Sequence, residues 1–78
     1  MKITRVGLDI AKSAFYVYGV DRHDQLQWQA NLKRGRWLDT LCKQVAPGAV
    51  IGMEACASSH HWARDLQRRG YTVKLVAA

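Results

Sequence analysis

The sequence contains no long hydrophobic run, and cysteine is scarce. No stretch approaches the roughly 18 consecutive apolar residues that a membrane-spanning helix needs. The first four residues lead into a strand pattern rather than into the apolar core of a signal peptide, so we expect a cytoplasmic protein. The two cysteines, Cys42 and Cys56, lie far apart in apolar surroundings, which favours reduced thiols over a disulfide framework. A zinc site of Cys56, His60 and His61 would lack a fourth ligand and is disfavoured.

Acidic residues are also few. Six acids face twelve Lys and Arg, which gives a net charge of +6. A domain this basic favours a polyanionic partner, nucleic acid first, although an idle basic surface is the plain alternative. The 78 residues are 49% hydrophobic, which indicates one small globular domain near the lower size limit for a hydrophobic core. We expect it to be a piece of something larger.

The first part of the chain alternates with the period of strands. Residues 3–11 place Val6, Leu8 and Ile10 on one face, and the aromatic and branched segment 13–20 follows closely enough to be antiparallel. After a polar turn at residues 21–24, the segment 25–31 alternates again. Its Leu26, Trp28 and Ala30 are predicted to share one face of a sheet-edge strand. The meander is therefore predicted to be antiparallel.

The period then changes to that of helices. Residues 35–45 carry one apolar stripe that ends before Pro47 and Gly48, and a second helix begins after Ser58 or Ser59 and stops at Gly70. Between and after them lie the strands 49–54 and 71–76, which the crossover rule makes parallel to the first strand. The predicted order is β-β-β-α-β-α-β, in a mixed five-stranded α/β sheet with the first strand central and helices on at least one face.

Two matching strand motifs carry acids. In residues 6–10 (VGLDI) and 50–54 (VIGME), a glycine stands two positions before Asp9 and Glu54, and so shares a face with the acid. An unpaired carboxylate is costly to bury, and parallel neighbouring strands about 4.8 Å apart would bring both acids to one divalent metal. Carboxylates suit Mg²⁺ or Mn²⁺. The alternative is that each acid caps or pairs with a nearby Lys or Arg.

These motifs resemble a known family. The segments 6–12 (VGLDIAK) and 51–56 (IGMEAC) with Ser58, and the terminal Gly70, Tyr71 and Val73, look like the amino-terminal RuvC-like domain of the DEDD-type transposases of the insertion sequence 110 family. The resemblance spans essentially the whole chain. It implies a ribonuclease H-like fold, truncated before its last helices, so that residues 1–78 form a single but incomplete amino-terminal domain.

The resemblance also implies an activity and a site. Members catalyse metal-dependent DNA strand cleavage and exchange during insertion-sequence transposition, with four acids that bind metal. Asp9 and Glu54 match the first two as catalytic and metal-binding residues; the other two acids, and the serine nucleophile of a second domain, have no counterpart in this sequence. The 78-residue chain alone is therefore expected to be inactive. DNA, a structured guide RNA and further copies of the chain are the implied partners.

Other residues are weaker candidates for nucleic-acid binding. Lys12 follows the first strand and could approach a phosphate, while Lys33, Arg34 and Arg36 cluster at a helix entrance, where positive charge opposes the helix dipole. A solvated surface is the alternative for all four. Ser58 fits a helix cap better than a nucleophile, and His60 and His61 fit a polar first turn better than proton transfer. The basic residues of the second helix are Arg64, Arg68 and Arg69, and Asp65 can pair with Arg69. They fit a solvated face better than a nucleic-acid surface. Trp28, Trp37 and Trp62 fit the core, although Trp28 on a sheet edge could stack a base.

Three other functions remain open. A Holliday-junction resolvase-type nuclease would share the acid pair but need further acids. An actin-like phosphotransferase would need a Gly-Thr-rich phosphate turn after Asp9, for which residues 11–13 (AKS) are a poor substitute. A non-catalytic remnant would keep the fold and bind nucleic acid or partner chains without cutting.

Overall fold

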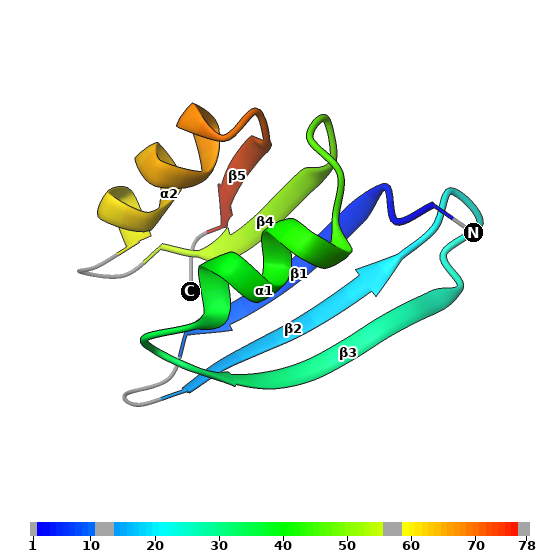
Figure 1. Cartoon of the computed structure of the whole chain (residues 1–78). Coiled ribbons are helices and arrows are strands. Elements are labelled where there is room, and N and C mark those ends of the chain that lie inside the picture. Colours follow the sequence, from blue (N-terminus) through cyan, green and yellow to red (C-terminus); the bar gives the residue numbers. More distant parts are fainter. Residues whose placement is uncertain (1, 11–13, 56–58, 77–78) are drawn as a thin grey trace.

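The computed structural model describes residues 2–10, 14–55 and 59–76. In this part of the chain the elements follow in the predicted order (Figure 1): β1 (Arg5–Ile10), β2 (Ala14–Val20), β3 (Leu26–Lys33), α1 (Trp37–Gln44), β4 (Val50–Glu54), α2 (Ser59–Arg68) and β5 (Thr72–Val76). The strands form one sheet in the order β3-β2-β1-β4-β5. β2 pairs antiparallel with β1 and β3, whereas β4 is parallel to β1 and β5 is parallel to β4. The predicted mixed sheet with a central first strand is confirmed.

The two helices cover one face of the sheet (Figure 1). Inward side chains alternate along each central strand, as the period-two pattern predicts, and together with the helices they build one core. The buried strand residues of this core are Val6, Leu8, Phe15, Val17, Ile51 and Met53. We call the other side of the sheet the open face; its central residues are Gly7, Asp9, Tyr16, Tyr18, Gly52, Glu54, Lys74 and Val76.

Three aromatic rings join the helices to the sheet. Trp37, the first residue of α1, stacks on Phe15 of β2 with ring centroids 4.5 Å apart and planes 11° from parallel. Trp62 of α2 forms T-shaped contacts with both rings. Its ring centroid lies 5.8 Å from that of Phe15 and 5.2 Å from that of Trp37. Such edge-to-face and stacked pairs add to the free energy gained from burial alone. The prediction that the tryptophans belong to the core is confirmed for Trp37, and Trp62 and Trp28 pack against the core while partly buried.

The β2–β3 turn changes the predicted pattern of the third strand. Gly19 pairs with Trp28, but Val20 pairs with Leu26, so the register shifts at this point and β3 holds one extra residue, Gln27. A bulge of this kind turns the residues beyond it toward the other face. Leu26 is consequently 54% exposed. The prediction that Leu26 shares a face with Trp28 and Ala30 is wrong, because simple alternation does not foresee the extra residue.

Glycine and tyrosine fix the end of each helix. Gly48 and Gly70 follow α1 and α2 with φ of +100° and +96°, a conformation that glycine adopts without strain. The hydroxyl of the buried Tyr71 donates a hydrogen bond to the carbonyl oxygen of Val45 at 2.6 Å. Burial, followed by the neighbouring Cys42 thiol, raises the pKa of Tyr71 to about 12. This bond therefore ties the start of β5 to the end of α1 with a neutral phenol.

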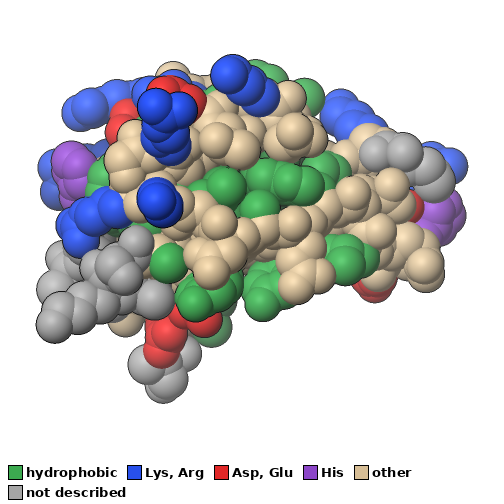
Figure 2. Space-filling view, turned by 60° about the horizontal axis from the view of Figure 1, so that its bottom comes forward, with side chains coloured by type: hydrophobic (Ala, Val, Ile, Leu, Met, Phe, Trp, Pro, Cys, Tyr) green, Lys and Arg blue, Asp and Glu red, His purple; other side chains and the backbone are tan. Residues whose placement is uncertain are grey.

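The charges are spread over the surface. Figure 2 shows Lys and Arg side chains around the border of the molecule and hydrophobic side chains nearer its middle. None of the described helices is long and apolar enough to cross a membrane. Cys42 is a free thiol, as predicted, while Cys56 lies outside the described residues.

Candidate functional site

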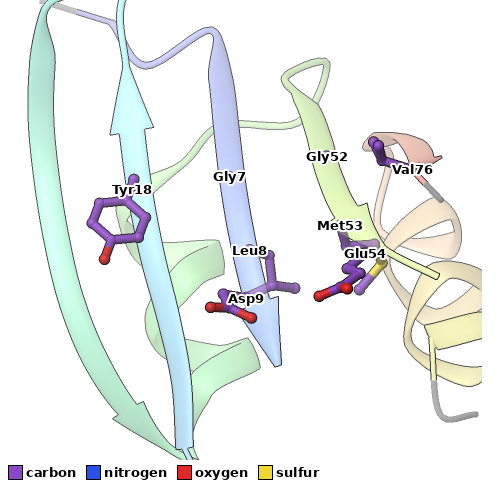
Figure 3. Close-up of a pocket in the computed structure, with 8 residues that line it drawn as sticks. All are labelled: Gly7, Leu8, Asp9, Tyr18, Gly52, Met53, Glu54 and Val76. Carbon is purple, nitrogen blue, oxygen red and sulfur yellow. The ribbon is translucent and has the colours of Figure 1, made fainter. Parts of the chain in front are cut away.

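Asp9 and Glu54 lie side by side on the open face. Gly7 pairs with Gly52, and Leu8 with Met53, in the parallel ladder of β1 and β4, and the acids occupy the next position of each strand. Neighbouring strands are about 4.8 Å apart. Figure 3 shows the two carboxylates at the same level of adjacent strands, on the same side of the sheet. The prediction that parallel neighbouring strands bring Asp9 and Glu54 close together agrees with this backbone register.

We call Asp9 and Glu54 the acid pair. Gly7 and Gly52 leave free space beside it. A Cβ atom at Gly7 would meet no atom within 4 Å, and one at Gly52 would meet only the carbonyl oxygen of Val6 at 3.9 Å. The result is an open depression of about 560 Å³. Its lining residues are Gly7, Leu8, Asp9, Tyr18, Gly52, Met53, Glu54 and Val76 (Figure 3). A ligand can thus approach the backbone of both strands next to the carboxylates.

Both acids are exposed to solvent. The expectation that they sit in buried surroundings and need a cation to offset desolvation does not hold, because the two helices cover only the opposite face. None of the described residues forms an ion pair with either acid, so the alternative in which each acid pairs with a nearby Lys or Arg finds no support there.

Two tyrosines flank the depression, a feature that the sequence reasoning did not single out. Tyr16 lies opposite Asp9, and Tyr18 opposite Gly7, in the antiparallel ladder of β1 and β2. On the other side, β5 places Lys74 beside Gly52 and Val76 beside Glu54. The signal was present in the alternation of the second strand, which puts both tyrosines on the face of Asp9.

The basic candidates lie apart from the acid pair. Lys33 is the last residue of β3, opposite Ala14, at the same end of the sheet as Asp9 but beyond β2. Arg34 and Arg36 follow in the turn that leads to α1, where Arg36 occupies the N-cap position without a side-chain capping bond. All three are exposed. Lys12 and Ser58 fall outside the described residues.

The second helix carries a separate polar surface. His60, His61, Arg64, Asp65 and Arg68 line a depression of about 350 Å³ on α2. Asp65 pairs with Arg69 at 3.8 Å, which confirms the predicted i, i+4 pair. Because α2 covers the face of the sheet opposite to the acid pair, the structure does not join these side chains to Asp9. Among the described residues, no group of three or more His, Cys, Asp or Glu side chains could hold a metal ion.

Comparison with known proteins relates the chain to transposases. It is 46% identical over 77 residues to a Pseudomonas aeruginosa protein named "Probable family 20 transposase", which covers 99% of this chain and 22% of that protein. It is 31% identical over 72 residues to the transposase for insertion sequence element IS1111A of Coxiella burnetii, covering 92% of this chain and 19% of that protein. The transposase for insertion sequence element IS1328 of Yersinia enterocolitica is 27% identical over 75 residues, covering 96% of this chain and 22% of that protein.

The chain thus spans about a fifth of the length of these relatives. No protein-family model matches it, and no solved structure matches it. The comparisons therefore establish sequence similarity to transposases over one segment.

Proposed function

We propose that the chain is the amino-terminal, ribonuclease H-like (RuvC-like) catalytic-domain segment of a DEDD-type transposase. Its activity in the whole protein is metal-dependent DNA strand cleavage and recombination during insertion-sequence transposition. The single observation that carries this proposal is the placement of Asp9 and Glu54 next to each other at the ends of the parallel strands β1 and β4. The similarity to transposases supports it independently.

The residues present fit a hard divalent cation. Two carboxylates on one face, with a bare glycine beside each, offer oxygen ligands and leave room for water or a phosphate oxygen. Asp9 and Glu54 would hold Mg²⁺ or Mn²⁺. Such an ion supplies activation of an attacking oxygen and stabilisation of the leaving oxygen in phosphodiester cleavage.

Two acids are half of the four that the DEDD resemblance implies. Mg²⁺ takes about six ligands, and it keeps several waters where the protein supplies few. We propose that the two remaining acids complete the site in the whole transposase, and that a guide RNA and further copies of the chain are its partners. The segment alone then binds metal weakly and gains affinity when a DNA phosphate supplies further oxygens.

A second candidate is a non-catalytic nucleic-acid-binding remnant. It is favoured by the net charge of +6 and by the absence of a third metal-ligating side chain near the acid pair among the described residues. In this case the positive charge alone would bind the phosphate backbone, and affinity would fall with salt. A resolvase-type nuclease segment would share the acid pair and would likewise need further acids.

Calorimetric titration with Mn²⁺ separates these candidates. We expect the unaltered chain to bind Mn²⁺ more tightly with a short DNA duplex than without it, and Asp9→Asn or Glu54→Gln to weaken binding by about tenfold or more, a loss of about 1.4 kcal/mol. Asp39→Asn is the matched control, since Asp39 is exposed on α1 away from the open face. Equal Mn²⁺ affinity in all four proteins, or none in any, would overturn the metal site and leave the remnant.

A further inference from the structure

We propose that Tyr16 and Tyr18 form a stacking platform for the unpaired bases of a DNA strand that crosses the open face. The inference rests on the proposed function for its choice of nucleic acid as partner and extends it to the form of the substrate. It concerns recognition of bases and does not involve the metal.

The two tyrosine side chains have the exposure and position that stacking requires. Tyr16 is 37% and Tyr18 is 43% exposed, although both stand on β2, an inner strand of the sheet. In Figure 3, which looks onto the open face, the ring of Tyr18 is seen face-on beside the ribbon of β2. An aromatic ring in this orientation offers its π-face to solvent, and a nucleobase can stack on it whatever its sequence.

Polar side chains that can read a base edge lie beside the rings. In the β2–β3 ladder, Tyr16 pairs with Asn31 and Tyr18 with Gln29. These four residues and Ala30 line a depression of about 440 Å³. Each amide has two donors and an acceptor, so it can bond to the edges of a base that is not already paired.

The register places this platform next to the acid pair. Directly opposed residues of an antiparallel pair have Cβ atoms about 4.5–5.5 Å apart, and Tyr16 stands opposite Asp9. A base stacked on Tyr16 therefore brings its sugar and phosphate toward Asp9 and Glu54. The depression at the acid pair and the one at the platform share Tyr18.

Charge and shape favour an unpaired strand as the occupant. Lys33 at one edge of the sheet and Lys74 at the other belong to the strands that border the open face, and both are exposed, so a phosphate backbone can find a cation on each side. In a duplex the base faces are stacked on one another and cannot reach a flat protein surface. Single strands present them, as in other sheets that bind unpaired nucleic acid through aromatic side chains.

The test is oligonucleotide binding without metal. Fluorescence anisotropy in EDTA would compare a labelled single strand of about ten nucleotides with the blunt duplex of the same sequence. We expect the single strand to bind more tightly, and Tyr18→Leu and Tyr16→Leu to weaken its binding by about five- to 100-fold each. Tyr18→Phe keeps the ring and should bind as the unaltered chain does. Asp39→Asn, which is exposed on α1 away from the open face, should leave this binding unchanged. Because EDTA removes any metal, failure of the metal site and failure of the platform are distinguishable.

Salt dependence tells stacking from charge. Because stacking releases no counterions, Tyr18→Leu should lower the affinity while leaving the slope of log K against log salt unchanged. Equal binding by Tyr18→Leu and Tyr18→Phe would overturn the platform, and so would a duplex that binds as tightly as the single strand. A second copy of the chain is the other possible occupant of the open face, and sedimentation of the same variants tests it. A dimer that dissociates in Tyr18→Leu, in a chain that binds no oligonucleotide, would assign the open face to this second copy and overturn the platform.

Discussion

At the residue scale, Asp21 is a buried carboxylate whose oxygens accept hydrogen bonds from three neighbouring groups. It is 1% exposed and accepts hydrogen bonds from the backbone N–H of His23 at 2.8 Å and of Gln25 at 3.1 Å. The side-chain amide of Gln27 donates a third at 3.0 Å. Burial acts to raise the pKa of Asp21, but the hydrogen bonds from Gln25 and His23, the charge of His23 and the Gln27 amide together lower the pKa below its ordinary value.

This pKa shift predicts acid sensitivity of the β2–β3 turn. A carboxylate with a lowered pKa in the folded state stabilises the fold above its unfolded pKa of about 3.9, and this contribution is lost as pH falls through the folded value. We expect Asp21→Asn to be less stable than the unaltered chain at pH 7 and the gap to narrow at pH 3. Urea denaturation at both pH values measures it. Asp39→Asn, at an exposed site, should show no such narrowing, and a constant gap for Asp21→Asn would contradict the explanation.

Some features of the candidate site could be predicted from the sequence, and others depend on the packing of the whole sheet. The neighbouring positions of Asp9 and Glu54 could be predicted from the sequence, because a helical crossover makes β4 parallel to β1 and two equal Gly-x-acid motifs then fall into register. Their exposure did not follow, since it depends on what covers each face of the sheet. The role of Asp21 was not predicted either, because the side chain of Gln27 that donates to it lies at the register shift between β2 and β3, which alternation does not reveal.

At the element scale, α2 is held on the sheet by a narrow apolar stripe. Leu66 is fully buried and Ala63 is 7% exposed, while the neighbouring Gln67 is exposed. Spacing alone predicted this stripe, and it predicted the stop at Gly70. It predicted β3 less well, since alternation of hydrophobic residues carries no sign of the register shift next to Gly19.

Truncation of Leu66 tests how much α2 contributes. Leu66→Ala removes buried methyl groups and leaves a cavity, which costs about 2–5 kcal/mol, a large share of the stability of a domain of this size. Urea denaturation should show a much lower midpoint with an unchanged slope. Gln67→Ala is the matched control and should stay within about 0.5 kcal/mol of the unaltered chain. A small effect for Leu66→Ala would mean that α2 is not part of the cooperative unit.

At the scale of the whole molecule, one face of the sheet carries the hydrophobic core and the other carries the candidate binding residues. The helix side contains the core, with its three joined aromatic rings, and so determines whether the chain folds. The open face contains the acid pair, the stacking platform and the two depressions that these residues line. Substitutions such as Asp9→Asn therefore remove exposed groups that the core does not use, and binding can be tested without unfolding the chain.

The two edges of the sheet differ in how well they are protected from other strands. β3 ends in Lys33 and carries polar Gln and Asn side chains and a register shift, all of which discourage pairing with a further strand. β5, the other edge, is short and presents Leu75 at 38% and Val76 at 59% exposure. Unpaired backbone groups beside exposed apolar side chains invite addition of a strand.

We therefore expect the 78-residue chain to self-associate through β5 as its concentration rises. Sedimentation velocity over a concentration series measures this, and Thr72→Lys, which adds a charge to the exposed start of β5, should shift the population toward monomer. Gln29→Lys adds the same charge to β3 and should leave the distribution unchanged if β5 is the contact. A monomer at every concentration would contradict the prediction. Association that responds to Gln29→Lys but not to Thr72→Lys would move the contact to β3, against the protection that its polar side chains provide.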